Sequence, residues 1–158
     1  AAPPGPGRDA GFLVSSVVPV APDSRPDCSS EVTHVGIIAK TLPVAGSKGS
    51  RDCEVLFDTG ASQSFVGKQV AKEIAEVMKA PQPMSFRLGN DGVMQVDESV
   101  MLSVEMGGHS LFGWFMVAPD LPFEVIAGAD FFQRWKIKLE PATEDFILDE
   151  KALRLLLV

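Results

Sequence analysis

A single aspartate stands at the end of an apolar run in the first half of the chain. Residues 55–57 read Val-Leu-Phe and are followed at once by Asp58, Thr59 and Gly60. The apolar run predicts a buried strand, and an aspartate at its end can either make an Asx-type turn or serve chemistry. Asp58 is therefore the first candidate for a catalytic residue.

Two other functional motifs are only partly matched around the same position. The nucleophile elbow of serine hydrolases requires Gly-x-Ser-x-Gly, but residues 60–64 read Gly-Ala-Ser-Gln-Ser and end in serine. A phosphate-binding loop requires four residues between its glycines and Ser or Thr after its lysine. Gly60 and Gly67 have six residues between them, and Lys68 is followed by Gln69. A serine hydrolase and a nucleotide-binding site are both disfavoured.

The cysteines and histidines give no sign of a metal site. Cys28 and Cys53 lie 25 residues apart without a Cys-x-x-Cys motif, and His34 and His109 are the only histidines. These four residues do not complete a known ligand spacing, although one disulfide remains open. We predict no metal and no cofactor, and we expect Cys53 to be a buried, small apolar residue.

Composition narrows the classes of partner. The chain has 158 residues and a net charge of −7, from 14 basic and 21 acidic residues, and no two basic residues are adjacent. A nucleic-acid partner is therefore not expected. Apolar residues make up 46% of the chain, which is typical of a folded soluble domain, and no run reaches the roughly 18 residues that cross a bilayer. We expect a soluble protein without a membrane segment, with the cytoplasm as one candidate compartment.

The amino-acid composition divides the chain into an N-terminal arm and a domain. Residues 1–31 hold six of the twelve prolines and predict an extended linker or N-terminal arm, in which residues 12–18 could add an edge strand. Residues 32–158 are expected to form one globular domain. The start at Ala1 fits either an excised piece of a longer protein or a cloning boundary.

The elements that must position Asp58 are mostly short strands. Residues 32–45 and 51–57 flank Gly-Ser-Lys-Gly-Ser and predict a β-hairpin. Residues 67–80 carry apolar side chains at helical spacing and predict an amphipathic helix that stops at Pro81. Further strands are expected on either side of Gly89-Asn90-Asp91-Gly92 and in four later runs, which are residues 98–106, 109–118, 136–140 and 145–149. Together with a short helix near residues 130–135, this pattern predicts an all-β, barrel-like domain.

Two motifs carry a resemblance to a known family. Residues 58–62 read Asp-Thr-Gly-Ala-Ser, and residues 125–132 read Val-Ile-Ala-Gly-Ala-Asp-Phe-Phe. In this order, with a glycine-containing hairpin between them, the chain resembles the retroviral-type, or retropepsin-like, aspartic proteases. Phe132 stands where leucine is usual in that family. The resemblance implies a closed β-barrel with a flap hairpin and one or two short helices, acting as a homodimer.

The resemblance also implies roles for particular residues. The activity that it implies needs two aspartates held so close together that they cannot readily both ionise, so that one stays protonated while the other activates water. The chain has one Asp-Thr-Gly, so the second carboxylate would be Asp58 of another copy in a two-fold symmetric dimer. Thr59 would hydrogen-bond across that interface, and Gly60 would let the substrate backbone approach. Ala61 matches the family's form of the motif, and Ser62 could bond the Asp58 carboxylate or the local backbone.

Two further segments complete the expected site. By the same resemblance, a flap over the cleft would bind the substrate backbone, and its residues would be Leu88, Gly89, Asn90, Asp91, Gly92 and Val93. The alternative for these residues is an ordinary surface hairpin. A structural element under the active site would comprise Ile126, Ala127 and Gly128, with Gly128 closely packed. Asp130 is expected to be structural, either capping the helix that follows it or pairing with Arg134.

The hypothesis is thus an aspartic endopeptidase that cleaves an extended peptide or polyprotein. The alternative is a catalytically silent dimerisation or peptide-binding module of the same fold. Trp114, Trp135 and the six methionines are predicted to fill the core and cleft. The apolar C-terminal run at 152–158 is predicted to be an edge strand, packed either within its own domain or between protomers.

Overall fold

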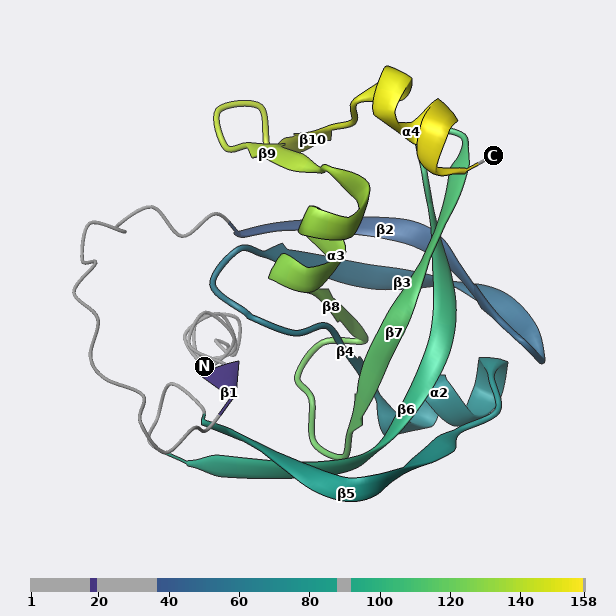
Figure 1. Ribbon diagram of the computed structural model, residues 1–158, viewed down its shortest axis with the longest axis vertical. Helices are drawn as coiled ribbons and strands as arrows, with labels where there is room; N and C mark the ends of the chain where they lie inside the picture. Colours follow the sequence, from purple (N-terminus) through teal and green to yellow (C-terminus); the bar gives the residue numbers. More distant parts are fainter. Residues whose placement is uncertain (1–17, 20–36, 88–91, 158) are drawn as a thin grey trace, which may run out of the picture.

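The computed structural model describes residues 18–19, 37–87 and 92–157, and within these ranges the chain is mostly β with three short helices (Figure 1). The predicted fold class is confirmed to that extent. The helices are α2 (Lys68–Ile74), α3 (Ala129–Trp135) and α4 (Glu150–Leu156). The strands are β1 (Val18–Pro19), β2 (Ile37–Gly46), β3 (Gly49–Asp58), β4 (Phe65–Gly67), β5 (Met78–Arg87), β6 (Val93–Met106), β7 (His109–Ala118), β8 (Val125–Ala127), β9 (Lys138–Glu140) and β10 (Asp145–Ile147).

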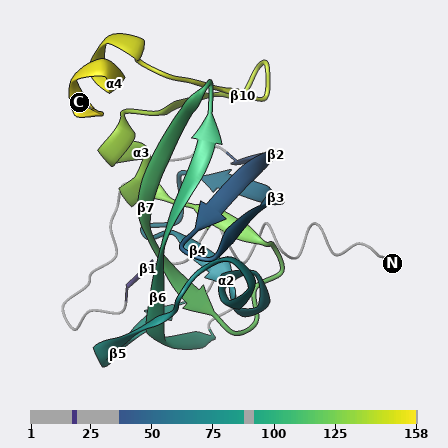
Figure 2. The same cartoon turned by 90° about the vertical axis from the view of Figure 1, so that its right-hand side faces the viewer.

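Eight strands form one sheet in the order β1-β5-β6-β2-β3-β8-β4-β7, and β7 pairs again with β6. The long strands β6 and β7 run between two ends of the molecule, one covered by β5 and the other by α4 with the β9–β10 pair (Figures 1 and 2). β1 lies at the outer edge of the sheet, where Val18 is opposite Arg87 and Pro19 is opposite Phe86. Of residues 12–18, which could add an edge strand, only Val18 is described, and it belongs to β1. Residues 12–17 and the rest of the predicted arm lie outside the described residues.

The predicted first hairpin is confirmed over residues 37–57. β2 and β3 pair antiparallel along their whole length, from Gly46 opposite Gly49 at the turn to Ile37 opposite Asp58 at the open end. Toward Asp58, β3 also pairs in parallel with β8. Residues 55–58 are all buried, because strands flank β3 on both sides and packed side chains cover both of its faces there.

The helix predicted over residues 67–80 is wrong in length, because α2 ends at Ile74. The turn between β2 and β3 hydrogen-bonds to the C-terminal end of α2. Lys48 N donates to Ile74 O at 2.8 Å, and Glu76 N donates to Ser47 Oγ at 2.9 Å. Beyond this point Met78 pairs with Ser99 of β6 and is half exposed. Tertiary hydrogen bonds therefore override a helical apolar pattern.

Most of the buried side chains form one large cluster inside the sheet, with α2 and α3 against it. A second, smaller cluster joins the strand before Asp58 to β5 and β6, and includes the perpendicular rings of Phe65 and Phe86 at 5.1 Å between centroids. Its buried members are Leu56, Ala61, Phe65, Phe86, Val96, Ala118 and Ile126. The strand that ends in Asp58 thus lies between two apolar clusters.

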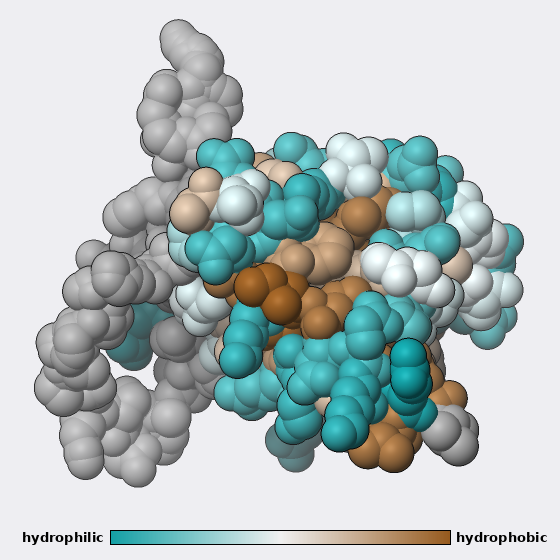
Figure 3. Space-filling view, turned by 90° about the horizontal axis from the view of Figure 1, so that it is seen from above, coloured by the Kyte–Doolittle hydropathy of each residue, from teal (hydrophilic) through white to brown (hydrophobic). Residues whose placement is uncertain are grey.

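The C-terminal run is a helix, so the prediction of an edge strand is wrong. Asp149 precedes α4, and its Oδ1 accepts from Ala152 N at 3.0 Å, which caps the helix. Leu153 is buried in the main cluster, whereas Leu155 is 76% exposed. Figure 3 views this end of the molecule and shows apolar surface surrounded by polar residues. An aspartate cap followed by good helix formers was the sequence signal that the strand prediction overlooked.

The burial of single side chains differs in part from what the sequence predicts. Trp135 is buried as predicted, but Trp114 is 43% exposed on β7, so its assignment to the core is wrong. Of the methionines, Met106 is buried, while Met78, Met84 and Met101 are largely exposed. Cys53 is buried, and burial raises the pKa of its thiol to about 11. None of the described helices is long and apolar enough to cross a membrane.

Candidate active site

Asp58 is the last residue of β3 and has no exposed surface. Its carboxyl oxygens have different surroundings. Oδ1 accepts a hydrogen bond from Gly60 N at 2.8 Å, whereas Oδ2 is buried and has no hydrogen-bond partner among the described residues. Burial raises the pKa of Asp58 from 3.8 to about 6, against the lowering effect of the Gly60 N–H. The side chain can therefore hold or release a proton near pH 6.

The turn after Asp58 is compact. Ala61 N donates to the backbone oxygen of Asp58 at 3.2 Å, and Ala61 is fully buried. Thr59 is exposed on this turn, while Gly60 and Ser62 are partly buried. The structure thus brings all five predicted residues of the motif into one turn, with the Asp58 carboxyl group held by the backbone of the turn itself.

The segment 126–128 lies directly against that turn, as expected from the sequence. Ile126 and Ala127 belong to β8 and are fully buried. A Cβ on Gly128 would lie 2.3 Å from Gln63 O and 2.7 Å from Ala61 O, so no side chain fits there without a shift of the backbone. Ala129 N also donates to Ala61 O at 2.7 Å. Two segments almost seventy residues apart in sequence form one tight unit.

Sequence reasoning missed Ser64. This residue is buried, its Oγ donates to Asp130 Oδ1 at 2.7 Å, and Gly128 N donates to the same Oγ at 2.9 Å. The Ser64 hydroxyl therefore joins the end of the turn at residues 58–64 to the start of α3. A lone serine before a buried strand carries no signal of such a partner, since the partner lies 66 residues away.

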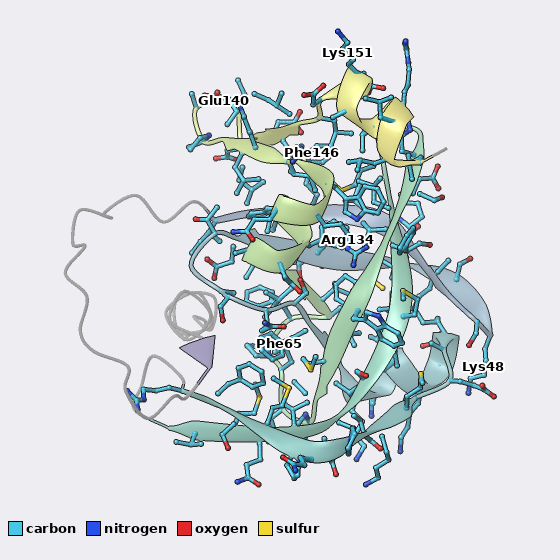
Figure 4. All side chains as sticks on the ribbon, viewed as in Figure 1. Lys48, Phe65, Arg134, Glu140, Phe146 and Lys151 are labelled. Atoms are coloured by element: carbon cyan, nitrogen blue, oxygen red, sulfur yellow. The ribbon has the colours of Figure 1, made fainter. Side chains whose placement is uncertain are left out.

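The expectation for Asp130 needs correction. Asp130 lies in the first turn of α3, but the helix begins after Gly128 without a side-chain cap. The Asp130 carboxylate accepts from Ser64 and from Phe131 N at 2.9 Å. Arg134 instead places its guanidinium over the ring of Phe112, 5.5 Å from the centroid, and Figure 4 shows it beside β7. Asp130 is structural as predicted, but through a partner that was not foreseen.

The flap prediction is only partly within the described residues. β5 and β6 pair antiparallel up to Arg87 opposite Val93, which is the arrangement of a hairpin. Residues 88–91 of the predicted flap lie outside the described residues. Of its other members, Gly92 is partly buried, and Val93 is 61% exposed at the start of β6.

The cavity beside α3 lies away from Asp58, and the described residues include no candidate metal site. The cavity of about 760 Å³ between α3 and the β9–β10 pair does not reach Asp58; it is lined by Phe132, Gln133, Lys136, Ile137, Lys138, Ile147 and Asp149. Within the described part of the chain, no group of three or more His, Cys, Asp or Glu side chains could hold a metal ion.

The family to which the chain belongs follows from a comparison with known protein families. Residues 29–153 match the family described as retroviral aspartyl protease, and the match covers most of the chain. The chain belongs to this family. The family assignment agrees with the two motifs that predicted it, because Asp58 and Gly128 both lie inside the matched region.

A solved structure supports the fold of this retroviral aspartyl protease family member. The retroviral protease-like domain of Ddi1 from Leishmania major is similar over 74% of this chain and 88% of that chain, with a TM-score of 0.50 and 16% sequence identity. At this identity the likeness shows the fold alone. No curated protein sequence matches the chain.

Proposed function

We propose that the protein is an aspartic endopeptidase whose catalytic centre forms when two copies bring their Asp58 carboxyl groups together. The observation that carries the proposal is the state of this side chain. It is fully buried, Gly60 N–H fixes Oδ1, and Oδ2 has no partner among the described residues. A buried oxygen without a hydrogen-bond partner is unfavourable, and a second carboxyl group with a water molecule would supply the missing hydrogen bonds.

The proposed reaction uses one ionised and one protonated Asp58. The ionised carboxylate removes a proton from water as the water oxygen attacks the peptide carbonyl carbon, and the protonated one donates to the carbonyl oxygen. The tetrahedral intermediate then collapses: the carboxyl group that took the proton from water gives a proton to the amide nitrogen as the C–N bond breaks. The other carboxylate takes a proton from a hydroxyl of the intermediate as the carbonyl group forms again. A like charge nearby would raise one pKa further, so that a single proton is shared by the pair.

The single Asp-Thr-Gly motif supports a two-fold symmetric homodimer, because each chain then supplies one carboxylate. We propose that Thr59 hydrogen-bonds across the interface and that Gly60 lets the substrate backbone approach. A closed barrel is also part of the proposal. It is supported by the strand pairings, which pass from β6 through β2, β3, β8, β4 and β7 and return to β6.

The proposed substrate is an extended peptide. The β5–β6 pair would lie over it as a flap, with residues 88–93 contacting its backbone. No cofactor is required for this chemistry. Catalysis would depend on an intact dimer, on the partial protonation of Asp58 and on access of an extended chain to the turn at residues 58–62.

The first test compares the parent protein with Asp58→Asn and Asp52→Asn. Asp52 lies on the same strand but is exposed, so it is a matched control for the loss of one carboxylate. We expect cleavage of a mixed peptide library between pH 4 and 7 by the parent and by Asp52→Asn, and a fall of at least about a thousandfold for Asp58→Asn. Mass spectrometry of the products measures the cleavage.

The alternative of a catalytically silent module gives a different result. The parent would then cleave nothing while still forming a dimer by light scattering. It would also fail to prefer a statine-type transition-state analogue over the corresponding plain peptide, whereas a working pair of aspartates binds such an analogue far more tightly.

A further inference from the structure

Besides Asp58, Ser64 is the one buried polar residue in the described ranges of the chain. Burial of a hydroxyl is unfavourable unless it is hydrogen-bonded. The Ser64 hydroxyl is hydrogen-bonded both as a donor and as an acceptor: it donates to Asp130 Oδ1 at 2.7 Å and accepts from Gly128 N at 2.9 Å. Its orientation is fixed, because the carboxylate can only accept and the backbone N–H can only donate.

The partner of Ser64 is itself held in place. Asp130 Oδ1 also accepts from Phe131 N at 2.9 Å, in the first turn of α3. Phe131 and Trp135 of this helix are buried in the main apolar cluster. The Ser64 hydroxyl is therefore bonded to a carboxylate that a packed helix holds still. Phe65, which follows it and is labelled in Figure 4, packs in the second cluster.

Short contacts connect this arrangement to Asp58. Gly128 lies against the backbone oxygens of Ala61 and Gln63, and Ala129 N donates to Ala61 O at 2.7 Å. Ala61 N in turn donates to Asp58 O at 3.2 Å. The turn at residues 58–64 is thus fastened to the 128–130 segment at its middle by backbone and at its end by Ser64.

We propose that Ser64 is a positioning residue, whose hydroxyl fastens the turn at residues 58–64 to the start of α3 and so fixes the place of the Asp58 carboxyl group. The role in catalysis rests on the proposed function, whereas the fastening does not. Ser64 acts through the backbone of the turn, since the hydrogen bonds of its hydroxyl go to Gly128 and Asp130. A small displacement of a reacting group lowers kcat more than it changes KM when substrate contacts are kept.

The decisive variants are Ser64→Ala and Ser64→Thr. Alanine removes the hydroxyl and leaves Gly128 N–H without its acceptor, whereas threonine keeps a hydroxyl in the same place. We expect Ser64→Ala to lower kcat by about tenfold or more with KM changed by less than about twofold, and Ser64→Thr to restore most of the loss. Val104→Ala is the control, because it weakens the buried core of β6 without touching the turn. At a similar loss of thermal stability it should keep the parent kcat.

A second measurement does not depend on cleavage. The titration of Asp58, followed by ¹³C NMR of its carboxyl carbon, should move toward the ordinary aspartate range in Ser64→Ala, because a loosened turn admits water. It should stay at the parent value in Val104→Ala. If the parent cleaves nothing but this shift is found, the proposed function fails while the positioning role stands.

Other outcomes overturn the proposal. A folded Ser64→Ala with the parent kcat and an unchanged Asp58 titration would do so. If Ser64→Ala does not fold, Asp130→Ala takes its place, since it removes the carboxylate that accepts from Ser64 and from Phe131 N and leaves the Ser64 hydroxyl for Gly128 N–H. The same two readouts then decide, and parent values in both would refute the role of Ser64.

Discussion

At the scale of single residues, the side chain of Asp58 combines two opposing influences. Its burial disfavours the charged form, and the Gly60 N–H at 2.8 Å favours it. Burial prevails, so the pKa is raised to about 6. A carboxyl group that keeps its proton in weak acid is suited to a reaction in which one aspartate donates while another accepts.

The raised pKa of Asp58 predicts how the free energy of unfolding depends on pH. Between pH 4 and 6 the folded state binds more protons at this site than the unfolded state, so stability falls as pH rises through that range. A difference of about two pKa units corresponds to about 3 kcal/mol. Asp58→Asn cannot ionise, so we expect it to be more stable than the parent by about 3 kcal/mol at pH 7 and similar to it at pH 4.

Urea unfolding of both proteins at equal concentration, from pH 4 to 8, measures this difference. Asp52→Asn serves again as the exposed control and should follow the parent at every pH. A constant difference between parent and Asp58→Asn across the range would contradict the raised pKa.

Gly128 and Gly49 provide a matched pair of glycine substitutions. An added Cβ at Gly128 would lie 2.3 Å from Gln63 O, whereas at Gly49 it would meet nothing within 4 Å. We expect Gly128→Ala to lower the free energy of unfolding by about 3 kcal/mol, because the backbone must shift, and Gly49→Ala to change it by less than about 1 kcal/mol. Chemical denaturation measures both, and equal effects would mean that the two segments do not pack closely.

At the scale of elements, local capping and tertiary contacts each decide where a helix ends. α2 stops at Ile74 because the turn between β2 and β3 bonds to its last carbonyl group. α4 begins where Asp149 caps it, and Glu150 at its first residue also contacts His109 Nε2 at 2.8 Å. Leu153 thus packs α4 against the core, while Leu155 and Leu156 of the same helix are exposed.

Removal of the cap tests the account of α4. Asp149→Ala should lower the free energy of unfolding by about 1 kcal/mol, because Ala152 N loses its acceptor. Asp149→Asn keeps an oxygen that can accept the same bond and should stay close to the parent. Thermal unfolding followed by circular dichroism measures both variants. Equal loss in the two would point to the charge of Asp149 rather than to its cap.

At the scale of the whole molecule, the chain carries one Asp-Thr-Gly turn on a framework of paired strands. Asp58 ends β3 between β2 and β8, and its turn is locked to the segment before α3. This framework can present a carboxyl group with little freedom to move. The sequence has one Asp-Thr-Gly, so the proposed reaction takes its second aspartate from another copy.

The proposed dimer predicts the activity of mixtures. When equal amounts of parent and Asp58→Asn are combined at a fixed total concentration, random pairing leaves about a quarter of the dimers with two intact aspartates. Activity should therefore fall to about a quarter of that of the parent alone. Mixing with an unrelated protein of similar mass should leave one half, apart from the effect of dilution. A result of one half with Asp58→Asn would show that single chains are sufficient.

How much could be predicted from the sequence depends on how local each feature is. The strand that ends in Asp58 and the hairpin before it follow from apolar patterning and turn residues, and the close packing of Gly128 followed from the family resemblance. The length of α2, the exposure of Trp114 and the partner of Asp130 were predicted wrongly. Each of these depends on residues far away in the chain, as with Lys48 and Ile74, or Ser64 and Asp130.

The sequence by itself determined the strand, the aspartate at its end and the family to which they belong, because an apolar run, turn residues and short motifs are properties of neighbouring residues. Only the tertiary structure decided the state of the Asp58 carboxyl group and the part played by Ser64. Burial and hydrogen bonding between distant segments set both, and those contacts exist only when β3, β8 and the start of α3 have come together.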